Sequence, residues 1–258
     1  MKLVSSLFST PKKGGHPREN EDHFFPHEAE VRRSRVSVAI ADGASEGYMS
    51  KLWSKILTIS YVNFDRMDLD VRRFTDFCVD IYDIQMERYI QGRLERGSPL
   101  RWFEENLMSK GSFSTLLGVT FVHSSPLGGH WVAYSVGDCC LFQLRGELID
   151  VFPAMDPSGF GNSPDLISSN PAYNVELESR VKVRTGRFLF GDTFYLMTDA
   201  IAHWFVTEIA AEEEPWNAVD MFLGSDSPGL LGYIDRLRGE NRLKNDDVTI
   251  ARVSLLEE

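Results

Sequence analysis

The sequence predicts an α+β fold in which mostly antiparallel sheets are accompanied by helices. Apolar segments typical of buried strands occur at 36–42, in a block from 114 to 145, and at 193–198 and 248–254. Apolar residues at helical spacing occupy 48–64 and 70–96, between the first strand and the block. This order lacks the regular β–α alternation of a parallel sheet, so it favours layered antiparallel sheets.

Local composition justifies each element of the first half in turn. Residues 36–42 (VSVAIAD) alternate large and small side chains, as a buried strand does. The second helical segment ends at 97–99 (GSP), where glycine and proline stop a helix. The block divides into strands 114–122, 130–136 and 139–145, which we expect to form a meander with turns at 128–129 and 137–138.

The second half mixes short elements. Residues 150–174 are rich in Pro, Ser, Asn and Asp and predict an irregular excursion. Residues 193–198 (TFYLMT) predict a strand, 200–210 a helix, and 216–239 short helices after Pro215. The segment 248–254 (VTIARVS) predicts a final strand. With 258 residues, we expect one domain over 1–258.

Composition and charge exclude several classes of protein. Hydrophobic residues make up 43% and charged residues 25% of the chain, which is ordinary for a globular protein. The formal net charge of −11 argues against nucleic acid or an anionic membrane as a partner, because both require a basic surface. No apolar run approaches the roughly 18 residues of a membrane span.

Cysteine usage and the first residues bear on the compartment. The three cysteines, Cys78, Cys139 and Cys140, have no regular spacing and do not form a disulfide framework. This usage indicates a reducing, cytoplasmic compartment. The first segment, MKLVSSLFSTPKK, has too broken an apolar stretch for a signal peptide.

Acidic residues adjoin the predicted strands at several points. Asp42, Asp138 and Asp199 follow strands, whereas Asp246 and Asp247 precede the last one. In an antiparallel pair the end of one strand lies beside the start of its neighbour, so we expect these acids at one edge of one sheet. Taken alone, each acid is usually a turn residue or a helix cap. The repeated arrangement favours a shared site.

Such a cluster predicts a site for divalent cations. Neighbouring carboxylates repel one another in a buried place unless positive charge compensates them. Oxygen-only ligands suit Mg²⁺ or Mn²⁺ better than Zn²⁺. Sequence motifs for zinc, for EF-hand calcium, for a P-loop and for a serine nucleophile elbow are all absent. Carboxylate sites that hold two ions commonly activate water against a phosphoryl group.

At this point the sequence resembles a known family. Six segments look like the ordered motifs of the metal-dependent PPM, or type 2C, serine/threonine protein phosphatases, in a short bacterial form. In chain order the segments are NED (Asn20–Asp22), ADGASEG (Ala41–Gly47), GSFSTLLGVTF (Gly111–Phe121), YSVGDCCLF (Tyr134–Phe142), FYLMTDAIAHWF (Phe194–Phe205) and NDDVTIARV (Asn245–Val253). The resemblance spans about residues 14–254.

The resemblance implies an α-β-β-α sandwich of two mostly antiparallel sheets with two Mg²⁺ or Mn²⁺ ions at one end. In this reading Asp42 bridges the two ions and the Gly43 carbonyl contributes to one of them. Asp199 and Asp246 ligate the other ion. The nucleophile is a water that bridges the ions, and no phosphoenzyme forms.

Further residues receive roles from the same resemblance. Glu21 and Asp22 act on the metals directly or through waters. Asp138, together with Asp199, matches the position that holds a third ion. The implied catalytic set is therefore Arg18, Asp42 and Asp22. The implied substrate is a phosphorylated protein, with a cognate kinase as a further partner and with the phosphatase acting as a monomer.

The sequence departs from the family pattern at the phosphate-binding position. The family's arginine lies four residues before the glutamate of the acidic pair, and Pro17 stands there in this chain. Arg18, in the basic loop PKKGGHPR, is the closest candidate for holding the phosphate, and His16 is the alternative. The flap region is replaced by residues 152–170, where we expect substrate choice to reside.

Two other functions stay open on the sequence alone. A catalytically weak pseudophosphatase that binds a phosphoprotein or regulates a partner accords with the displaced arginine. A hydrolase of small phosphorylated metabolites would use the same residues. The retention of Asp42, Asp199 and Asp246 favours catalysis, because a binding module needs no such set.

Overall fold

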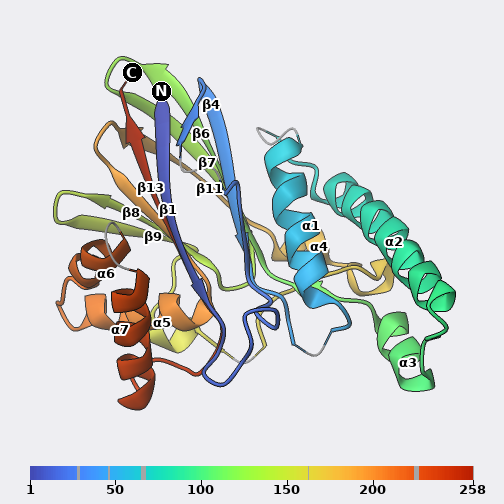
Figure 1. The fold of residues 1–258 in the computed structure, drawn as a ribbon. Helices are drawn as coiled ribbons and strands as arrows, with labels where there is room; N and C mark the ends of the chain where they lie inside the picture. The colour runs from blue at the N-terminus through green and yellow to red at the C-terminus, as the bar shows by residue number, and fades with distance from the viewer. Residues whose placement is uncertain (28–29, 46, 65–67, 162, 224–226, 258) are drawn as a thin grey trace.

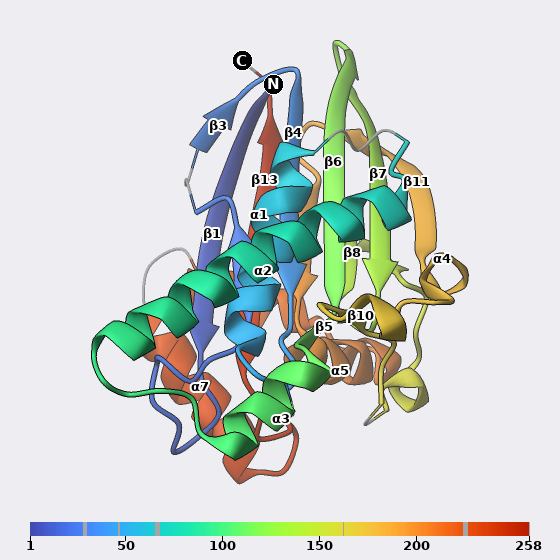
Figure 2. The same cartoon turned by 90° about the vertical axis from the view of Figure 1, so that its right-hand side faces the viewer.

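The computed structural model describes residues 1–27, 30–45, 47–64, 68–161, 163–223 and 227–257. Glu46, Asn162 and residues 224–226 belong to segments discussed above and lie outside these ranges. The described chain forms two large sheets that pack face to face, with helices on both outer faces (Figures 1 and 2). Every strand pairing among the described residues is antiparallel.

Strand order defines the two sheets and a short ribbon. The six-stranded sheet has the order β3 (Glu30–Arg32), β1 (Lys2–Thr10), β13 (Val248–Leu256), β12 (Thr193–Met197), β8 (Cys140–Arg145), β9 (Leu148–Phe152). The five-stranded sheet has the order β11 (Lys182–Leu189), β7 (Gly128–Val136), β6 (Leu116–Ser125), β4 (Arg35–Ala41), β2 (His23–Phe25). The ribbon pairs β10 (Ile167–Ser168) with β5 (Phe113–Ser114).

Helices cover each sheet on its outer face. Helices α1 (Ser50–Asn63) and α2 (Val71–Glu95) lie against the five-stranded sheet. Helices α5 (Asp199–Ala210), α6 (Pro215–Leu223) and α7 (Ser227–Gly239) lie against the six-stranded sheet. The remaining short elements are α3 (Trp102–Lys110), α4 (Leu177–Arg180) and the 3-10 turns η1 (Pro157–Gly159) and η2 (Pro171–Tyr173). The predicted α-β-β-α sandwich is confirmed.

Period-2 alternation builds the three layers of core. In β4, Val36, Val38 and Ile40 point into the space between the sheets, whereas Ala39 and Ala41 point toward α1 and α2. Strand β12 alternates in the same way, with two side chains between the sheets and two against α5. Burying both faces of a strand requires near-continuous apolar sequence, which is the pattern that identified these strands.

The predicted meander is wrong at its second turn. Strands β6 and β7 form a hairpin as expected, but β8 belongs to the other sheet and pairs with β12 and β9. The chain crosses between the sheets at Gly137, which has φ +101°. A Cβ there would lie 2.5 Å from Cγ2 of Thr115, so both conformation and space require glycine at this crossing.

Several elements were not predicted from the sequence, and β1, β11 and α3 show why. Strand β1 carries Ser5, Ser6 and Ser9, which break its apolar pattern, yet it pairs with β13 along nine residues. Strand β11 is a polar edge strand and α3 has no fully buried side chain, so neither has strong hydrophobic periodicity. Their positions depend on tertiary pairing, which local patterns do not report.

The three cysteines are buried in the core. Cys139 lies in the core between the sheets, whereas Cys140 faces α5, so the two occupy opposite faces of the strand. All three thiols are free and buried.

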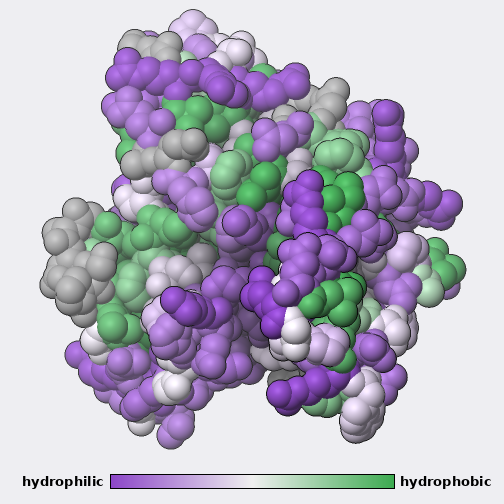
Figure 3. All heavy atoms as spheres, turned by 45° about the vertical axis from the view of Figure 1, so that its right-hand side comes forward, coloured by the Kyte–Doolittle hydropathy of each residue, from purple (hydrophilic) through white to green (hydrophobic). Residues whose placement is uncertain are grey.

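In the described part of the chain, no helix has both the length and the apolar character needed to traverse a bilayer. Hydrophilic residues predominate on the face shown in Figure 3, with smaller apolar patches between them.

Close packing of α1 on β6 gives a first prediction. A Cβ on Gly118 would lie 2.4 Å from the ring of Tyr61, so Gly118→Ala overpacks this contact and lowers the free energy of unfolding by about 1–3 kcal/mol. Gly232, which lies within α7 with open space around it, is the matched control. Gly232→Ala should raise stability by about 0.5–1 kcal/mol. Urea denaturation of both variants tests the pair, and equal effects would refute the packing argument.

Candidate functional site

Acidic residues gather at one end of the sandwich, as expected, but they come from both sheets. Asp42 and Asp138 follow β4 and β7 of the five-stranded sheet. Asp199 follows β12 and Asp246 precedes β13, both in the six-stranded sheet. The expectation of one edge of one sheet is therefore wrong. The sandwich itself aligns these strand ends, so the acids face one another across the gap between the layers.

Backbone contacts fix the position of Asp42. The Ser114 hydroxyl and the Thr115 N–H both donate to the Asp42 carbonyl, at 2.8 and 2.9 Å. The Asp42 N–H donates to Oγ1 of Thr115 at 2.9 Å. Gly43 follows in a buried position where a Cβ would lie 3.0 Å from the carbonyl oxygens of Glu21 and Ser50. Glycine thus lets the chain after Asp42 pass close to the loop that carries the acidic pair.

The hydroxyl of Thr198 ties Asp22 to the opposite sheet. Oγ1 of Thr198 donates to Oδ2 of Asp22 at 2.9 Å and accepts the N–H of Thr249 at 3.0 Å. Asp22 is 7% exposed, and its N–H donates to the Asn20 side-chain carbonyl. Thr198 was not singled out from the sequence. The sequence signal that could have identified it is its position just before Asp199, at the end of a buried strand.

The neighbouring acids Asp246 and Asp247 have different roles. Oδ1 of Asp247 accepts the N–H of Lys12 at 2.9 Å, and Oδ2 accepts the N–H of Glu21 at 2.8 Å. Both of its carboxylate oxygens therefore hold the loop between β1 and β2. Asp246 is one-third exposed at its side chain and accepts the Asp247 N–H through Oδ1. The charge of Asp246 acts on Asp42, and its assignment as a metal ligand stays a prediction.

Glu21 lies beside the same cluster. The Ser45 hydroxyl donates to its carboxylate at 2.5 Å, and its backbone carbonyl accepts the Ser54 hydroxyl of α1 at 2.7 Å. Burial raises the pKa of Glu21, and the nearby charges of Asp247 and Asp246 add to this effect while Ser45 opposes it. Glu21 thus lies beside Asp246 and Asp247, and its action on the metals stays a prediction.

Burial and mutual repulsion dominate the electrostatics of the cluster. Burial raises the pKa of Asp22 to about 8 and that of Asp138, with the charge of Asp199 added, to about 7. Burial also raises the pKa of Asp42 well above its usual range, and the charges of Asp22, Asp199, Asp246 and Asp138 raise it further. The charged forms of Asp22, Asp42 and Asp138 are therefore destabilised by burial and by neighbouring carboxylates, which is the condition that bound cations relieve.

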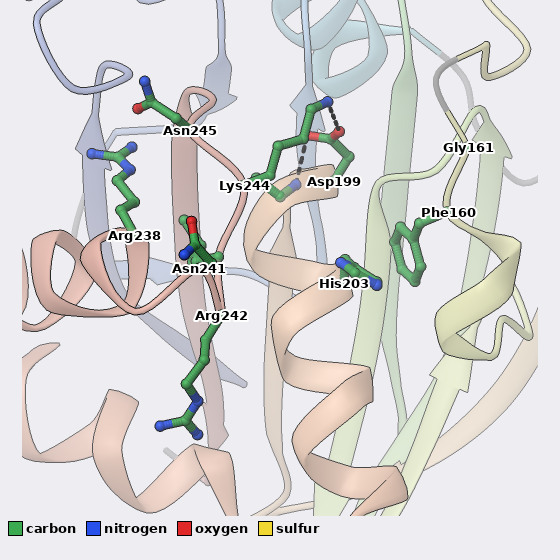
Figure 4. Close-up of a pocket in the computed structure, with 11 residues that line it drawn as sticks. Phe160, Gly161, Asp199, His203, Arg238, Asn241, Arg242, Lys244 and Asn245 are labelled. Carbon is green, nitrogen blue, oxygen red and sulfur yellow. Dashed lines mark hydrogen bonds and ion pairs between the residues drawn. The ribbon is translucent and has the colours of Figure 1, made fainter.

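Lys244 supplies a positive charge to the cluster. Its ammonium lies 3.3 Å from Oδ2 of Asp199 and 2.8 Å from Oδ2 of Asp246. Figure 4 shows Lys244 directed at Asp199 at the start of α5. Burial lowers the pKa of Lys244, but its contacts with Asp246 and Asp199 outweigh burial and leave the pKa above its usual range. Sequence reasoning missed this residue, although it lies only two positions before Asp246.

The residues fit a pair of hard cations in their chemistry. One oxygen of Asp22 and one of Asp138 are buried without a hydrogen-bond partner among the described residues. Such orphaned oxygens are costly unless a cation or water satisfies them. The donor set contains only oxygen, as Mg²⁺ and Mn²⁺ prefer. As the described side chains stand, however, no group of three or more His, Cys, Asp or Glu is close enough to hold an ion. The expected convergence of Asp42, Asp199 and Asp246 into a ready ligand set is therefore absent.

Arg18 and His16 lie in the exposed loop between β1 and β2. The Arg18 N–H donates to Nδ1 of His16 at 3.1 Å, and the Arg18 carbonyl accepts the Lys51 ammonium at 3.2 Å. Both side chains are exposed. The loop is held near α1 by Lys51 and near β13 by Asp247. The assignment of the phosphate to Arg18 or His16 stays a prediction.

A pocket of about 440 Å³ opens beside Asp199. His203, one turn along α5, lines it together with Phe160, whose ring centroid lies 5.3 Å from the imidazole (Figure 4). Phe160 belongs to the segment 152–170, and the adjacent turn η1 also contacts α5. The segment that replaces the expected flap therefore forms one wall of the pocket.

Relief of repulsion gives a second prediction, for the metal-free protein. The pKa of Asp42 is higher in the folded protein than in the unfolded chain. The free energy of unfolding therefore falls as the pH rises above about 4. Asp42→Asn removes this loss and should raise the free energy of unfolding by about 1 kcal/mol or more at pH 8, and by less at pH 5. Urea denaturation in EDTA at both pH values measures it, with exposed Asp80→Asn as control. A variant less stable than its parent at pH 8 would contradict this account.

Comparisons with known proteins find likeness in structure rather than in sequence. No family model matches the chain, and no curated protein matches it. The serine/threonine phosphatase PstP of Mycobacterium tuberculosis superimposes with a TM-score of 0.57 at 16% identity, over 100% of both chains. PstP has also been solved with two manganese ions, and that structure superimposes equally well.

Two further solved structures have the same architecture. The phosphatase domain of SpoIIE from Bacillus subtilis gives a TM-score of 0.52 at 15% identity, over 99% of this chain and 93% of that one. PppA, a regulatory component of T6SS in Pseudomonas aeruginosa, gives 0.52 at 17% identity, over 98% and 97%. The chain therefore has the fold of type 2C phosphatases, as the resemblance of its motifs predicted.

Proposed function

We propose that residues 1–258 form one phosphatase domain that hydrolyses phosphoserine and phosphothreonine on proteins with the help of Mg²⁺ or Mn²⁺. One observation carries the proposal: the gathering of Asp22, Asp42, Asp138, Asp199 and Asp246 at one end of the sandwich. A purely structural protein gains nothing from carboxylates that raise one another's pKa in a buried place. The fold of the solved phosphatases supports the same reading.

Asp42 is the residue best placed to bridge two ions. The backbone around it is fixed by Ser114 and Thr115, and the charges of four other carboxylates act on it. We assign the Gly43 carbonyl to one ion and the carboxylates of Asp199 and Asp246 to the other. When bound, the ions would supply a water of lowered pKa and positive charge against the phosphoryl oxygens.

The chain's own residues prepare the rest of the reaction. Thr198 orients Asp22 toward the cluster and leaves its second oxygen free. We assign Glu21 and Asp22 to the metals or to waters around them, and Asp138 with Asp199 to a third ion. Arg18, or else His16, would hold the phosphoryl group through charge-assisted hydrogen bonds. The wall formed by Phe160 restricts the approach of substrates beside Asp199.

A phosphoprotein substrate is the partner proposed here. PppA is a regulatory component of its secretion system, and SpoIIE is a determinant of cell fate. By analogy we propose that this chain acts as a monomer in the cytoplasm and reverses the action of a cognate kinase. The pocket beside Asp199 is lined in part by Lys244 and Arg242, whose positive charges suit a phosphorylated side chain that projects from a protein surface.

A catalytically weak pseudophosphatase is the second candidate, and a specific contact favours it. Lys244 engages the two carboxylates that the proposed mechanism assigns to one ion. If the chain is such a protein, it should bind phosphoprotein while hydrolysing an aryl phosphate no faster than its Asp42→Asn variant does.

Loss of the bridging acid gives the third prediction. At saturating Mn²⁺ the parent should hydrolyse a generic aryl phosphate, and EDTA should abolish the activity. Asp42→Asn should lower kcat by more than about 100-fold while the fold is retained, because both ions lose a shared ligand. The matched control is Asp150→Asn. Asp150 is an exposed acid of β9 that pairs with Arg184 of β11, and this variant should keep parental rates. Mn²⁺-dependent turnover by Asp42→Asn at the parental rate would refute the assignment.

The phosphate contact gives the fourth prediction. Arg18→Ala should lower kcat/KM by about 10- to 100-fold, mainly through KM, because a charged hydrogen bond to the phosphoryl group is lost. Binding of Mn²⁺ should be unchanged. His16→Ala is measured beside it, since the two residues share one loop and the His16 ring accepts the Arg18 N–H. If His16→Ala alone loses activity, the role belongs to His16.

A further inference from the structure

Lys244 pairs with two carboxylates of the acidic cluster at once. It lies in the loop between α7 and β13, and it joins Asp199, from the first turn of α5, to Asp246, at the start of β13. The ammonium thus connects carboxylates from two elements that are distant in sequence. Figure 4 shows its stem running along the pocket toward Asp199.

The two carboxylates have their remaining oxygens occupied. Oδ1 of Asp199 accepts the Ala200 N–H at 2.6 Å, and Oδ1 of Asp246 accepts the Asp247 N–H at 3.0 Å. Lys244 takes Oδ2 of both. A cation that binds this pair in the manner proposed above must therefore compete with the ammonium for the same oxygen atoms.

Other cations of the pocket are engaged elsewhere. Arg242 pairs with Glu208 at 2.7 Å and with Glu240 at 3.6 Å. Arg238 is buried and donates to the carbonyls of Pro11 and Asp246. Among the described ion pairs, only those of Lys244 reach Asp199 or Asp246. Its side chain is 48% exposed and borders open pocket space, so the ammonium has room to move aside.

From this geometry we infer that Lys244 is a resident counter-ion of the Asp199–Asp246 pair and competes with a divalent cation for it. In the metal-free protein the ammonium offsets the repulsion between the two carboxylates. When a cation binds, Lys244 must leave both oxygens, and the affinity of this position is lowered by the cost of breaking the two contacts. The inference rests on the proposed function, because the cation position is the one assigned there.

The test compares Lys244→Met with Arg242→Met. Both side chains line the same pocket and are 48% exposed, and both pair with carboxylates, but Arg242 does so outside the acidic cluster. Two measurements are made on each purified chain. The first is thermal unfolding in EDTA, and the second is calorimetric titration of the metal-free protein with Mn²⁺ alone.

Competition makes the two readouts move in opposite directions. Lys244→Met should lower the Tm of the metal-free protein by about 2–4 °C and tighten the Kd of one Mn²⁺ position by about tenfold. Arg242→Met should leave Mn²⁺ affinity unchanged. Lys244→Arg keeps the charge and should hold the affinity near the parental value.

The outcomes separate this inference from the proposed function. If the parent binds Mn²⁺ and Lys244→Met binds it with the same affinity, the competition is overturned and the metal site stands. If neither chain binds Mn²⁺ at millimolar concentration, the proposed metal site fails and the competition fails with it. If only Lys244→Met binds Mn²⁺, the competition is supported in its strongest form, and the pseudophosphatase candidate is favoured.

Discussion

Repulsion among carboxylates at one end of the sandwich is the constraint to which the surrounding structure responds. Asp42 has its pKa raised first by burial and then by four neighbouring acids. Folding brings these groups together only because the two sheets and their flanking helices bury enough apolar surface to outweigh the cost. The compensating contacts include hydroxyls from Thr198 and Ser45 and an ammonium from Lys244.

Much of the fold and of the site was predictable because the decisive segments are strongly apolar. Strands such as β4 and β12 are buried on both faces, so their sequences are almost wholly hydrophobic and stand out from any surroundings. An acid that directly follows such a strand must lie at the end of a sheet. The prediction that Asp42 and Asp199 lie at the same end of the fold followed from that placement, and the charge of Asp199 raises the pKa of Asp42. Their convergence with Asp246 into a ready ligand set did not follow from it and is absent among the described side chains.

Other features were beyond local sequence patterns. Alternation shows which side chains share a face of a strand but not which strand lies beside it, so β8 was placed in the wrong sheet. Strand β1 carries serines and is recognisable only through its pairing with β13. The role of Lys244 depends on a contact across 45 residues with Asp199, and no spacing rule anticipates such a contact.

The two hydrogen bonds that Asp247 accepts from the loop between β1 and β2 affect the order in which the chain can fold during synthesis. This carboxylate holds the backbone of Lys12 and Glu21, and the strand it precedes lies between β1 and β12. A nascent chain that stops short of residue 246 lacks both these hydrogen bonds and β13, the longer of the two partners of β1. One edge of β1 therefore stays unpaired until β13 has been synthesised.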